Sequence, residues 1–373
     1  MNNMNLLDEH KIIRIDTKKI RTRYPRLYGK NSRLPEHSYG VDCLIYNIFT
    51  DKGASGWGLG RLPLTQSNEA FTSSLIGKCV SELFNPKIGI LNKELIPLDF
   101  ALHDLAGVIL NIPVYKMLGN EIDQHINCYD GAIYMNDISP SSRPGGLQSI
   151  IDDCKQDYDM GYSSFKLKIG RGGMWMDKEE GLKRDIEVTR AVRKHFPNCS
   201  ILVDGNDAFT IDTLLRYLDA VSDCDLFWVE EPFKENREDL LKLKEFLAKK
   251  SPRTLVADGE FDPDVDLVLS LAEEKLIDVL LMDIEGFGFT NWRKLMSRIS
   301  DKNYLISPHC WPLKLKTHYS AHFAAAFKNT ITIEGVPDET EGVDFKDYKL
   351  TNGYIYVPDK PGFGMDFIWG RNI

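Results

Sequence analysis

Six ionisable residues recur in the second half of the chain, each at or just after the end of a short apolar run. They are Asp204, Glu230, Glu260, Asp283, His309 and Glu334. Neighbouring members of this series are roughly 25 residues apart, the length that one strand, one helix and two short loops require. In a barrel of alternating strands and helices, the C-terminal ends of all strands open on one face. The spacing therefore predicts one pocket that collects a functional group from each of six strands.

Two more strands are expected upstream of this series. One lies near Cys128 and the other spans residues 165–169. Amphipathic helix patterns separate the apolar runs from residue 127 onward. Eight strands are enough to close a barrel. We therefore predict an α/β fold with a TIM-type barrel over residues 126–339.

The first third of the chain has a different pattern. An apolar run at residues 43–50 precedes the Gly-rich sequence DKGASGWG, as in a strand followed by a turn, and residues 66–118 carry helical patterning that is broken at Pro113. The segment 351–367 is strand-like, punctuated by Pro and Gly, and is expected to return to the N-terminal part. A chain of 373 residues exceeds the size of one growing core. We predict an α+β capping domain over residues 1–125, completed by residues 340–373.

The composition argues against several kinds of partner. The chain has 46 basic and 55 acidic residues and a net charge of −9, which makes a general nucleic-acid surface improbable. No stretch approaches the ~20 apolar residues of a membrane helix, and the first residues lack the layout of a signal peptide. We expect a cytoplasmic protein that acts on a small molecule. Its seven scattered cysteines are expected to be reduced and mostly buried, with a packing role for Cys310 beside His309.

Three successive members of the series are carboxylates. Asp204, Glu230 and Glu260 offer the hard oxygen ligands that Mg²⁺ prefers. Grouped carboxylates without a cation would repel one another and their pKa values would rise, so a bound ion is the simplest explanation of the group. One such residue alone is equally typical of the start of a surface helix. Asn206, in the sequence DGN, is expected either behind the metal ligands or simply in a turn.

Lys166 and Lys168 are two positions apart in the run FKLKI, so their side chains point to the same side of a strand. An isolated pattern of this kind more often faces solvent, but helices cover the outer face of a barrel. Inside the barrel each ammonium would lower the pKa of the other, and a nearby divalent cation would lower it further. This predicts a neutral amine base near physiological pH.

Asp283 and His309 end neighbouring strands of the predicted barrel. The carboxylate can hold the Nδ1–H group of the imidazole and leave Nε2 toward a substrate. A lone histidine before Cys-Trp-Pro would more often be structural, and the pairing with Asp283 favours a catalytic role. Glu334, as a protonated or proton-sharing carboxyl, could hydrogen-bond a substrate carboxylate.

At these residues the chain resembles the enolase superfamily, within it the mandelate racemase subgroup. The barrel motifs are KLK at 166–168, VDGN at 203–206, VEEP at 229–232, GE at 259–260, MD at 282–283, PH at 308–309 and IEG at 333–335. Outside the barrel, SGWG at 55–58, PVYKMLG at 113–119 and VPDKPGFG at 357–364 are also similar to that family. The resemblance covers nearly the whole chain. It implies a modified (β/α)7β barrel with an α+β capping domain, a Mg²⁺ cofactor and a homo-oligomer.

The resemblance also implies a role for each candidate residue. The implied Mg²⁺ ligands are Asp204, Glu230 and Glu260. Lys168 is implied as one acid/base group and His309, oriented by Asp283, as the other on the opposite face of the substrate. Lys166 would assist at the substrate carboxylate and Glu334 would brace it.

Removal of the proton α to a carboxylate gives an enediolate, which only a strong local positive charge can stabilise. Loss of a β-hydroxyl group then gives a 2-keto-3-deoxy acid, whereas reprotonation from the opposite face inverts the centre. We predict a hydro-lyase that dehydrates a sugar acid, with a racemase or epimerase of a 2-hydroxy acid as the alternative. A metal-dependent hydrolase is less favoured, because such enzymes usually bind their metal through more histidines than this series contains. A catalytically silent relative is less favoured too, because every acid/base position expected for the family is filled.

The preference for a sugar acid rests on the surroundings of the predicted pocket. The segment 21–40 is basic and aromatic, and by resemblance it closes over the substrate, where polar side chains suit a polyhydroxylated anion. Arg21 and Tyr24 of this segment, with Trp311, are the candidate substrate-binding residues. The same segment could instead be a solvated loop. The insert at 171–182 resembles that of acid-sugar dehydratases, whereas GFGF after Asp283 departs from the paired glycines usual in the family.

Overall fold

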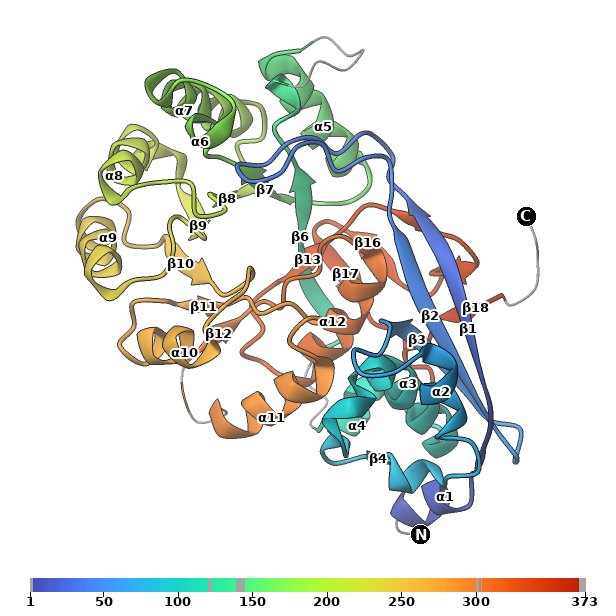
Figure 1. Ribbon diagram of the computed structural model, residues 1–373. Helices are drawn as coiled ribbons and strands as arrows, with labels where there is room; N and C mark the ends of the chain where they lie inside the picture. The colour runs from blue at the N-terminus through green and yellow to red at the C-terminus, as the bar shows by residue number, and fades with distance from the viewer. Residues whose placement is uncertain (1–2, 120–122, 139–144, 300–301, 303, 369–373) are drawn as a thin grey trace.

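The computed structural model describes residues 3–119, 123–138, 145–299, 302 and 304–368, and its centre is a barrel of parallel strands (Figure 1). The barrel strands are β6 (His125–Ile133), β7 (Ser164–Lys168), β8 (Ser200–Asp204), β9 (Leu226–Glu230), β10 (Leu255–Asp258), β11 (Val279–Leu280), β12 (Leu305–Ile306) and β13 (Ile333–Gly335). Their order in the sheet follows the chain, and β13 returns to pair with β6. A parallel bridge between Ile306 and Thr330 joins β12 to the approach of β13. The predicted eight-stranded barrel is confirmed.

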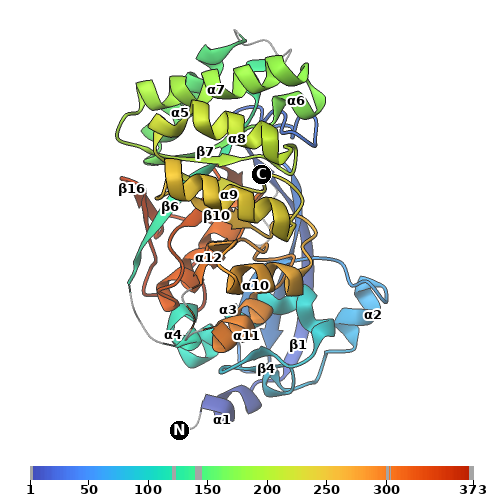
Figure 2. The same cartoon turned by 90° about the vertical axis from the view of Figure 1, so that its left-hand side faces the viewer.

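Helices cover the outside of the barrel, as the two views at right angles show (Figures 1 and 2). They are α5 (Leu147–Asp159), α6 (Arg171–Met174), α7 (Lys178–His195), α8 (Ile211–Ala220), α9 (Arg237–Lys250), α10 (Val265–Glu273), α11 (Phe289–Ile299) and α12 (Lys314–Ala326). Each of the first seven strands is followed by a helix, which gives the (β/α)7β pattern. Polar caps fix where the helices begin: Thr210, Asn236 and Asp264 each accept a backbone N–H in the first turn of α8, α9 and α10.

The barrel interior consists of an apolar layer below a charged one. The apolar layer is a buried cluster of Tyr129, Leu202, Trp228, Ala257, Val279 and Leu281. Because side chains alternate along a strand, the next inward positions after Leu202 and Trp228 are Asp204 and Glu230. The strand register sets Lys168 beside Asp204, and Asp204 beside Glu230. The apolar layer therefore closes the barrel beneath a row of charges at its C-terminal end.

The N-terminal part packs a helix tightly on an antiparallel sheet. The sheet consists of β1 (Ile12–Arg23), β2 (Asp42–Thr50) and β3 (Ser55–Gly60), and the helix is α3 (Asp99–Leu110). A Cβ atom on Gly56 would lie 2.2 Å from the backbone nitrogen of Leu105, so the glycines of SGWG allow the close approach. The other elements of this part are α1 (Asn3–Asp8), α2 (Asn68–Ser73), η1 (Val80–Glu82), β4 (Phe84–Asn85), β5 (Gly89–Ile90), η2 (Lys93–Leu98) and α4 (Val114–Leu118), and the barrel also carries η3 (Asn136–Ile138) and η4 (Ser222–Cys224).

The C-terminal segment divides between the two parts of the molecule. β14 (Glu339–Thr340) pairs with β1, and the indole N–H of Trp57 donates to the carbonyl of Met365 at 3.1 Å. The hairpin of β16 (Lys349–Thr351) and β17 (Tyr354–Tyr356) pairs instead with the barrel strand β6, and β15 (Val343–Asp344) pairs with β18 (Asp366–Phe367). The expected return to the N-terminal part is therefore incomplete. The domain boundaries at residues 125 and 340 stay a prediction.

Two expectations from composition can be compared with the described residues. No helix in the described part of the chain combines the length and the apolar character needed to cross a membrane. All seven cysteines are free, and all but Cys79 are buried. Burial raises the pKa of the Cys310 thiol, which agrees with a packing role.

Candidate active site

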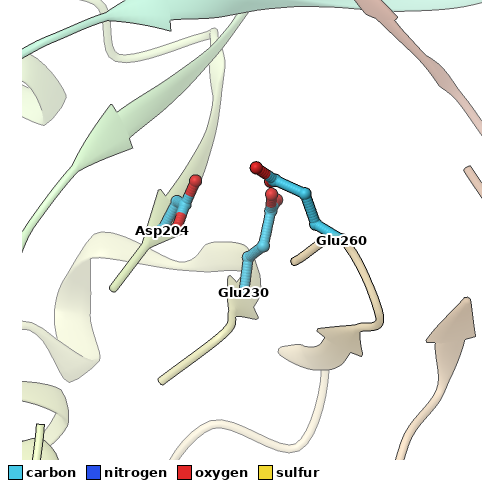
Figure 3. A group of neighbouring side chains, drawn as sticks. All are labelled: Asp204, Glu230 and Glu260. Carbon is cyan, nitrogen blue, oxygen red and sulfur yellow. The ribbon is translucent and has the colours of Figure 1, made fainter. Parts of the chain in front are cut away.

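Three carboxylates converge at the C-terminal end of the barrel. Asp204 ends β8, Glu230 ends β9 and Glu260 lies two residues beyond β10, and Figure 3 shows their side chains pointing toward one another. One ligand oxygen from each lies within 4.8 Å of those of the other two. Glu260 Oε2 is buried and has no hydrogen-bond partner. A set of hard oxygen donors with an unpartnered buried carboxylate oxygen fits a divalent cation of the Mg²⁺ type.

The two lysines of β7 lie against these carboxylates. Lys168 donates to Asp204 Oδ2, and Lys166 Nζ lies 2.7 Å from Glu230 Oε1. The predicted lowering of their pKa values included a divalent cation beside them, and it stays a prediction for the metal-bound site. Burial lowers the pKa of each lysine, but the adjacent carboxylates more than offset it, and both pKa values lie above their usual range. The sequence shows two neighbouring ammonium groups, whereas the fold brings carboxylates closer to each of them.

His309 and Asp283 form a hydrogen-bonded pair. A parallel bridge joins their backbones, and His309 Nδ1 lies 2.8 Å from Asp283 Oδ2. His309 Nε2 lies 3.2 Å from Glu260 Oε1 and 3.6 Å from Glu334 Oε2. Burial lowers the pKa of His309, but these three carboxylates raise it above its usual value. The three carboxylates therefore favour the protonated form of the ring.

Lys168 and His309 lie at opposite ends of the row of carboxylates. Lys168 contacts Asp204 on β8, and His309 contacts Glu260 beyond β10. A substrate atom held at the row would therefore have an ammonium on one side and an imidazole on the other. Such an arrangement can remove a proton from carbon on one face and deliver a proton on the other.

Lys316 also contacts the pair formed by His309 and Asp283. The sequence pattern did not predict this lysine. Its ammonium lies 2.5 Å from Asp283 Oδ2 and 2.7 Å from the carbonyl oxygen of Trp311. The side chain is only 4% exposed. Lys316 lies on α12 rather than at the end of a strand, so the strand-end spacing that found the other residues could not find it.

The surroundings of Glu334 favour the carboxylate over the protonated or proton-sharing acid considered from the sequence. Its Oε2 accepts the backbone N–H groups of Cys310 and Trp311 at 2.7 and 2.9 Å, and its Oε1 lies 2.8 Å from Lys166 Nζ. Burial raises the pKa of Glu334, but Lys166 and His309 lower it by more, and the net result is a pKa of about 2. An ionised Glu334 cannot donate a hydrogen bond. It instead accepts hydrogen bonds from Lys166 and from the backbone of Cys310 and Trp311, and so fixes their positions.

Asn206 lies immediately behind the carboxylates. Its backbone N–H donates to Asp204 Oδ1 at 2.9 Å, and its side-chain Nδ2 donates to Glu231 Oε2 at 3.4 Å. Its φ of 42° is typical of a turn. The two interpretations of Asn206 are therefore compatible, because the turn is what brings the amide to Asp204.

The segment between β1 and β2 covers this end of the barrel. In Figure 1 it is the blue segment that runs from the N-terminal sheet to a position beside β7 and α5. Arg26 is buried and pairs with Asp157 of α5 at 2.5 Å. Ser32 Oγ donates to the carbonyl of Gly205 at 2.8 Å, and Arg33 pairs with Asp207. These contacts tie the segment to the barrel, unlike those of a solvated loop. We call residues 24–40 the lid segment.

The three candidate substrate-binding residues have different surroundings. Arg21 is directed elsewhere, because its guanidinium donates to Asp42 at 2.9 Å and to the Gly40 carbonyl. The Tyr24 hydroxyl donates to the carbonyl of Pro312 at 3.0 Å, so its polar atom serves the fold. Trp311 lies beside the site, because its backbone N–H donates to Glu334. Of the three, only Trp311 is brought next to the charged residues.

Two further residues near the site were not singled out from the sequence. Tyr134 directly follows β6, and its ring centroid lies 5.6 Å from Lys168 Nζ. His37, in the lid segment, packs on Tyr134 with ring centroids 4.5 Å apart. Tyr134 lies at the C-terminal end of its strand, on the face of the barrel where the series is gathered, so the strand-end pattern could have found it. His37 carries no such pattern.

A cavity of about 470 Å³ opens at the other end of the barrel. Its polar lining includes Asn127, Ser163 and Asn198, and no carboxylate or ammonium group of a described residue lines it. Barrel enzymes carry their chemistry at the C-terminal ends of the strands. The row of carboxylates, rather than this cavity, is therefore the candidate active site.

A parallel barrel with ionisable groups gathered at the C-terminal ends of its strands is the architecture of a barrel enzyme. Residues 149–369 match the family described as enolase C-terminal domain-like, and the chain belongs to this family. The resemblance to the enolase superfamily, and the fold that it implied, are confirmed.

Relatives named as dehydratases are distant in sequence, but they match most of the chain. The chain is 21% identical over 349 residues to D-xylonate dehydratase of Haloferax volcanii, which covers 86% of this chain and 82% of the relative. It is 24% identical to the putative L-rhamnonate dehydratase of Caldivirga maquilingensis, over 90% of this chain and 84% of that protein. The crystal structure of a galacturonate dehydratase mutant from Geobacillus sp., complexed with Mg, is 29% identical with a TM-score of 0.90 and covers 96% of this chain and 93% of that one.

Proposed function

We propose that the protein is a Mg²⁺-dependent dehydratase that converts a sugar acid into a deoxy keto acid. The observation that carries the proposal is the placement of Lys168 and His309 at the two ends of the row formed by Asp204, Glu230 and Glu260. The dehydratases among the relatives support the same reaction class. Their named substrates are D-xylonate, L-rhamnonate and galacturonate.

Asp204, Glu230 and Glu260 would hold the Mg²⁺ ion. When bound, Mg²⁺ supplies positive charge that stabilises an enediolate next to the substrate carboxylate. Lys166, buried between Glu230 and Glu334, adds a fixed ammonium on the same side of the pocket. With its oxygens engaged as ligands, Asp204 would favour the protonated form of Lys168 less strongly, and a neutral amine would become accessible.

In the proposed reaction, Lys168 or His309 removes the proton from the carbon next to the carboxylate. The electron pair of the C–H bond becomes the second bond of the enediolate. The other group donates its proton to the hydroxyl on the next carbon, the C–O bond breaks and water leaves. Tautomerisation of the resulting enol gives a 2-keto-3-deoxy acid from an aldonic acid. General acid/base help of this kind contributes about 10²- to 10⁴-fold in rate.

The same two groups also allow a second reaction. If the proton is returned to the α-carbon from the opposite face and no hydroxyl leaves, the product is the epimer or enantiomer. Racemisation or epimerisation of a 2-hydroxy acid is therefore the alternative, and it rests on the same opposed placement of Lys168 and His309.

A panel of aldonic and uronic acids, assayed for keto products in D₂O with and without a chelator, tests the proposal. Dehydration predicts a keto product from at least one acid, with loss of activity in chelator and recovery with Mg²⁺. Epimerisation predicts deuterium at the α-carbon of the epimer without a keto product. Turnover that persists in chelator, or that needs Zn²⁺, would contradict the proposed site.

A small carboxylate is the proposed partner. Assembly into a homo-oligomer and a cytoplasmic location stay predictions. The proposal allows either Lys168 or His309 to remove the α-proton. The face of the α-carbon on which deuterium enters in D₂O distinguishes the two.

A further inference from the structure

His37 is the imidazole that the lid segment brings next to the candidate active site. Its ring centroid lies 4.5 Å from that of Tyr134 and 5.8 Å from that of Trp311. Tyr134 in turn lies beneath the ammonium of Lys168. The ring of His37 is therefore one aromatic contact away from a candidate base, on the side of the pocket that the lid covers.

The hydrogen bond of His37 to the lid backbone decides which ring nitrogen carries a proton. Nδ1 lies 2.7 Å from the carbonyl oxygen of Gly29. A carbonyl oxygen only accepts hydrogen bonds, so Nδ1 must be the protonated nitrogen. In the neutral ring Nε2 is then an acceptor, and no hydrogen bond of Nε2 is found among the described residues.

The electrostatic surroundings favour the neutral ring. Burial lowers the pKa of His37 and outweighs the hydrogen bond to Gly29, which raises it. The ammonium of Lys168 lowers this pKa further, whereas Glu260 raises it. A neutral imidazole with its hydrogen on Nδ1 has no proton on Nε2 to give to a leaving hydroxide.

The aromatic cluster around His37 consists of Tyr24, Tyr28, Tyr134 and Trp311, and two of these four side chains use their polar atoms within the protein. The Tyr24 hydroxyl donates to the Pro312 carbonyl, and the Tyr28 hydroxyl donates to the Pro337 carbonyl at 2.9 Å. The Tyr134 hydroxyl and the Trp311 indole N–H, like His37 Nε2, have no hydrogen-bond partner among the described residues. Three polar atoms of this aromatic cluster are thus left for a bound molecule, and His37 Nε2 is the one that can only accept in the neutral ring.

We propose that His37 is a specificity-determining residue whose Nε2 accepts a hydrogen bond from a hydroxyl group on the distal carbons of the sugar acid. The inference rests on the proposed function, which places the carboxylate and the α-carbon at the metal ligands, Lys166 and Lys168. The lid side of the pocket then faces the part of the substrate beyond the reacting carbons. His37 selects acids that extend to this side and carry a hydroxyl there.

Two substitutions separate this role from a role in holding the lid. His37→Asn can still donate to the Gly29 carbonyl from the position of Nδ1 but has no atom at Nε2. His37→Gln places an amide oxygen near the position of Nε2 but loses the Nδ1 contact. A role in recognition predicts that Gln is the milder change, whereas a purely structural role of the bond to Gly29 predicts that Asn is the milder change.

The experiment compares galactonate, which has distal hydroxyls, with glycerate, which ends at the β-hydroxyl. For galactonate we expect His37→Asn to raise KM about tenfold and His37→Gln to raise it less, because one hydrogen bond is lost. For glycerate, measured as substrate or as competitive inhibitor, the change should stay below about twofold. The matched control is His125→Asn, on an exposed histidine at the far end of β6.

Calorimetric titration of both acids in the presence of Mg²⁺ keeps the test independent of turnover. If wild type dehydrates no acid but its affinity for galactonate still depends on His37, the proposed function fails and this inference stands. If wild type dehydrates galactonate and the variants weaken both acids equally, or if His37→Asn is the milder change, this inference is overturned and the proposed function stands.

Discussion

Buried charges are tolerated in the candidate site because each one has a counter-charge at hydrogen-bond distance. Lys166 is fully buried between Glu230 and Glu334, and Lys168 is paired with Asp204. Burying an unpaired charge would cost several kcal/mol. The same pairing favours the protonated form of both lysines. A bound ligand must therefore weaken the ion pairs before the pKa of Lys168 can fall and its amine can act as a base.

Replacement of either candidate acid/base group should abolish turnover without unfolding the protein. Lys168→Ala and His309→Asn each remove one proton-transfer group, and we expect kcat to fall by about 10² to 10⁴ or more. Steady-state kinetics on the acid found with the panel, together with circular dichroism, measure the two effects. Lys155→Ala, on an exposed lysine of α5, is the control. Full activity in both catalytic variants would mean that the assignment of the acid/base groups is wrong.

Glu334 makes stability depend on pH in the acid range. Its pKa falls from an ordinary 4.5 to about 2 in the folded protein, so between these values the unfolded chain binds a proton that the folded chain does not. Stability from this residue is therefore present above about pH 5 and is lost as the pH falls toward 2, on the order of 3 kcal/mol in all.

The test compares urea unfolding of wild type and Glu334→Gln in a chelating buffer. The difference in unfolding free energy should shrink as the pH is lowered from 6 to 3, because the wild type alone loses this contribution. Glu339→Gln, on an exposed glutamate a few residues away, should show a constant difference. A constant difference for Glu334→Gln as well would contradict the lowered pKa.

At the residue scale, position was easier to predict from sequence than ionisation state. The strand-end spacing located Asp204, Glu230 and His309, because the position of a residue along a barrel strand determines the face it reaches. The pKa direction of Lys168 depends on distances to carboxylates of other strands. Those distances are properties of the closed barrel, and no local pattern contains them.

At the level of elements, the barrel strands that carry the histidine pair are the shortest ones. β11 and β12 have two residues each, and Asp283 and His309 lie beyond their ends. The backbone bridge between the two residues extends the pairing to the site. The apolar runs predicted both strands, but only the fold shows that the functional residues are held by this extra bridge and by Lys316.

The lid segment illustrates what a linear pattern leaves open. Its composition was compatible both with a cover over the substrate and with a solvated loop. Arg26 decides between them, because its guanidinium is buried with Asp153 and Asp157 of α5, more than a hundred residues further along the chain. Pairings over such a distance cannot be read from local sequence.

Removing the buried arginine should destabilise the protein strongly. Arg26→Met leaves two carboxylates buried without a cation, which we expect to cost about 3 to 5 kcal/mol in the free energy of unfolding. Chemical denaturation measures the change. The control is Arg190→Met, which breaks an exposed pair with Asp223 and should cost less than about 1 kcal/mol. Equal costs for the two variants would mean that the Arg26 pair is not buried in solution.

For the molecule as a whole, binding of Mg²⁺ to the three carboxylates should raise the unfolding temperature. A ligand that binds only the folded state stabilises it, by about 2.7 kcal/mol at one hundred times its Kd. We expect Mg²⁺ at one hundred times its Kd to raise the unfolding temperature by roughly 3 °C. Differential scanning calorimetry and isothermal titration measure the two quantities.

The matched variants for this measurement are Glu230→Gln and Glu238→Gln. Glu230→Gln should weaken Mg²⁺ binding and remove most of the thermal shift, because one ligand charge is lost. Glu238 is exposed at the start of α9 and should leave both unchanged. Unaltered Mg²⁺ affinity in Glu230→Gln would exclude Glu230 from the ligand set.

The two ends of the chain meet in one sheet, where Thr22 of β1 faces Thr340 of β14. A ribosome releases the first of these residues long before it has made the second, so the nascent N-terminal sheet must wait, with its edge open, for almost the entire barrel to be synthesised. A polypeptide truncated before residue 339 would contain every candidate catalytic residue but no strand to finish this sheet.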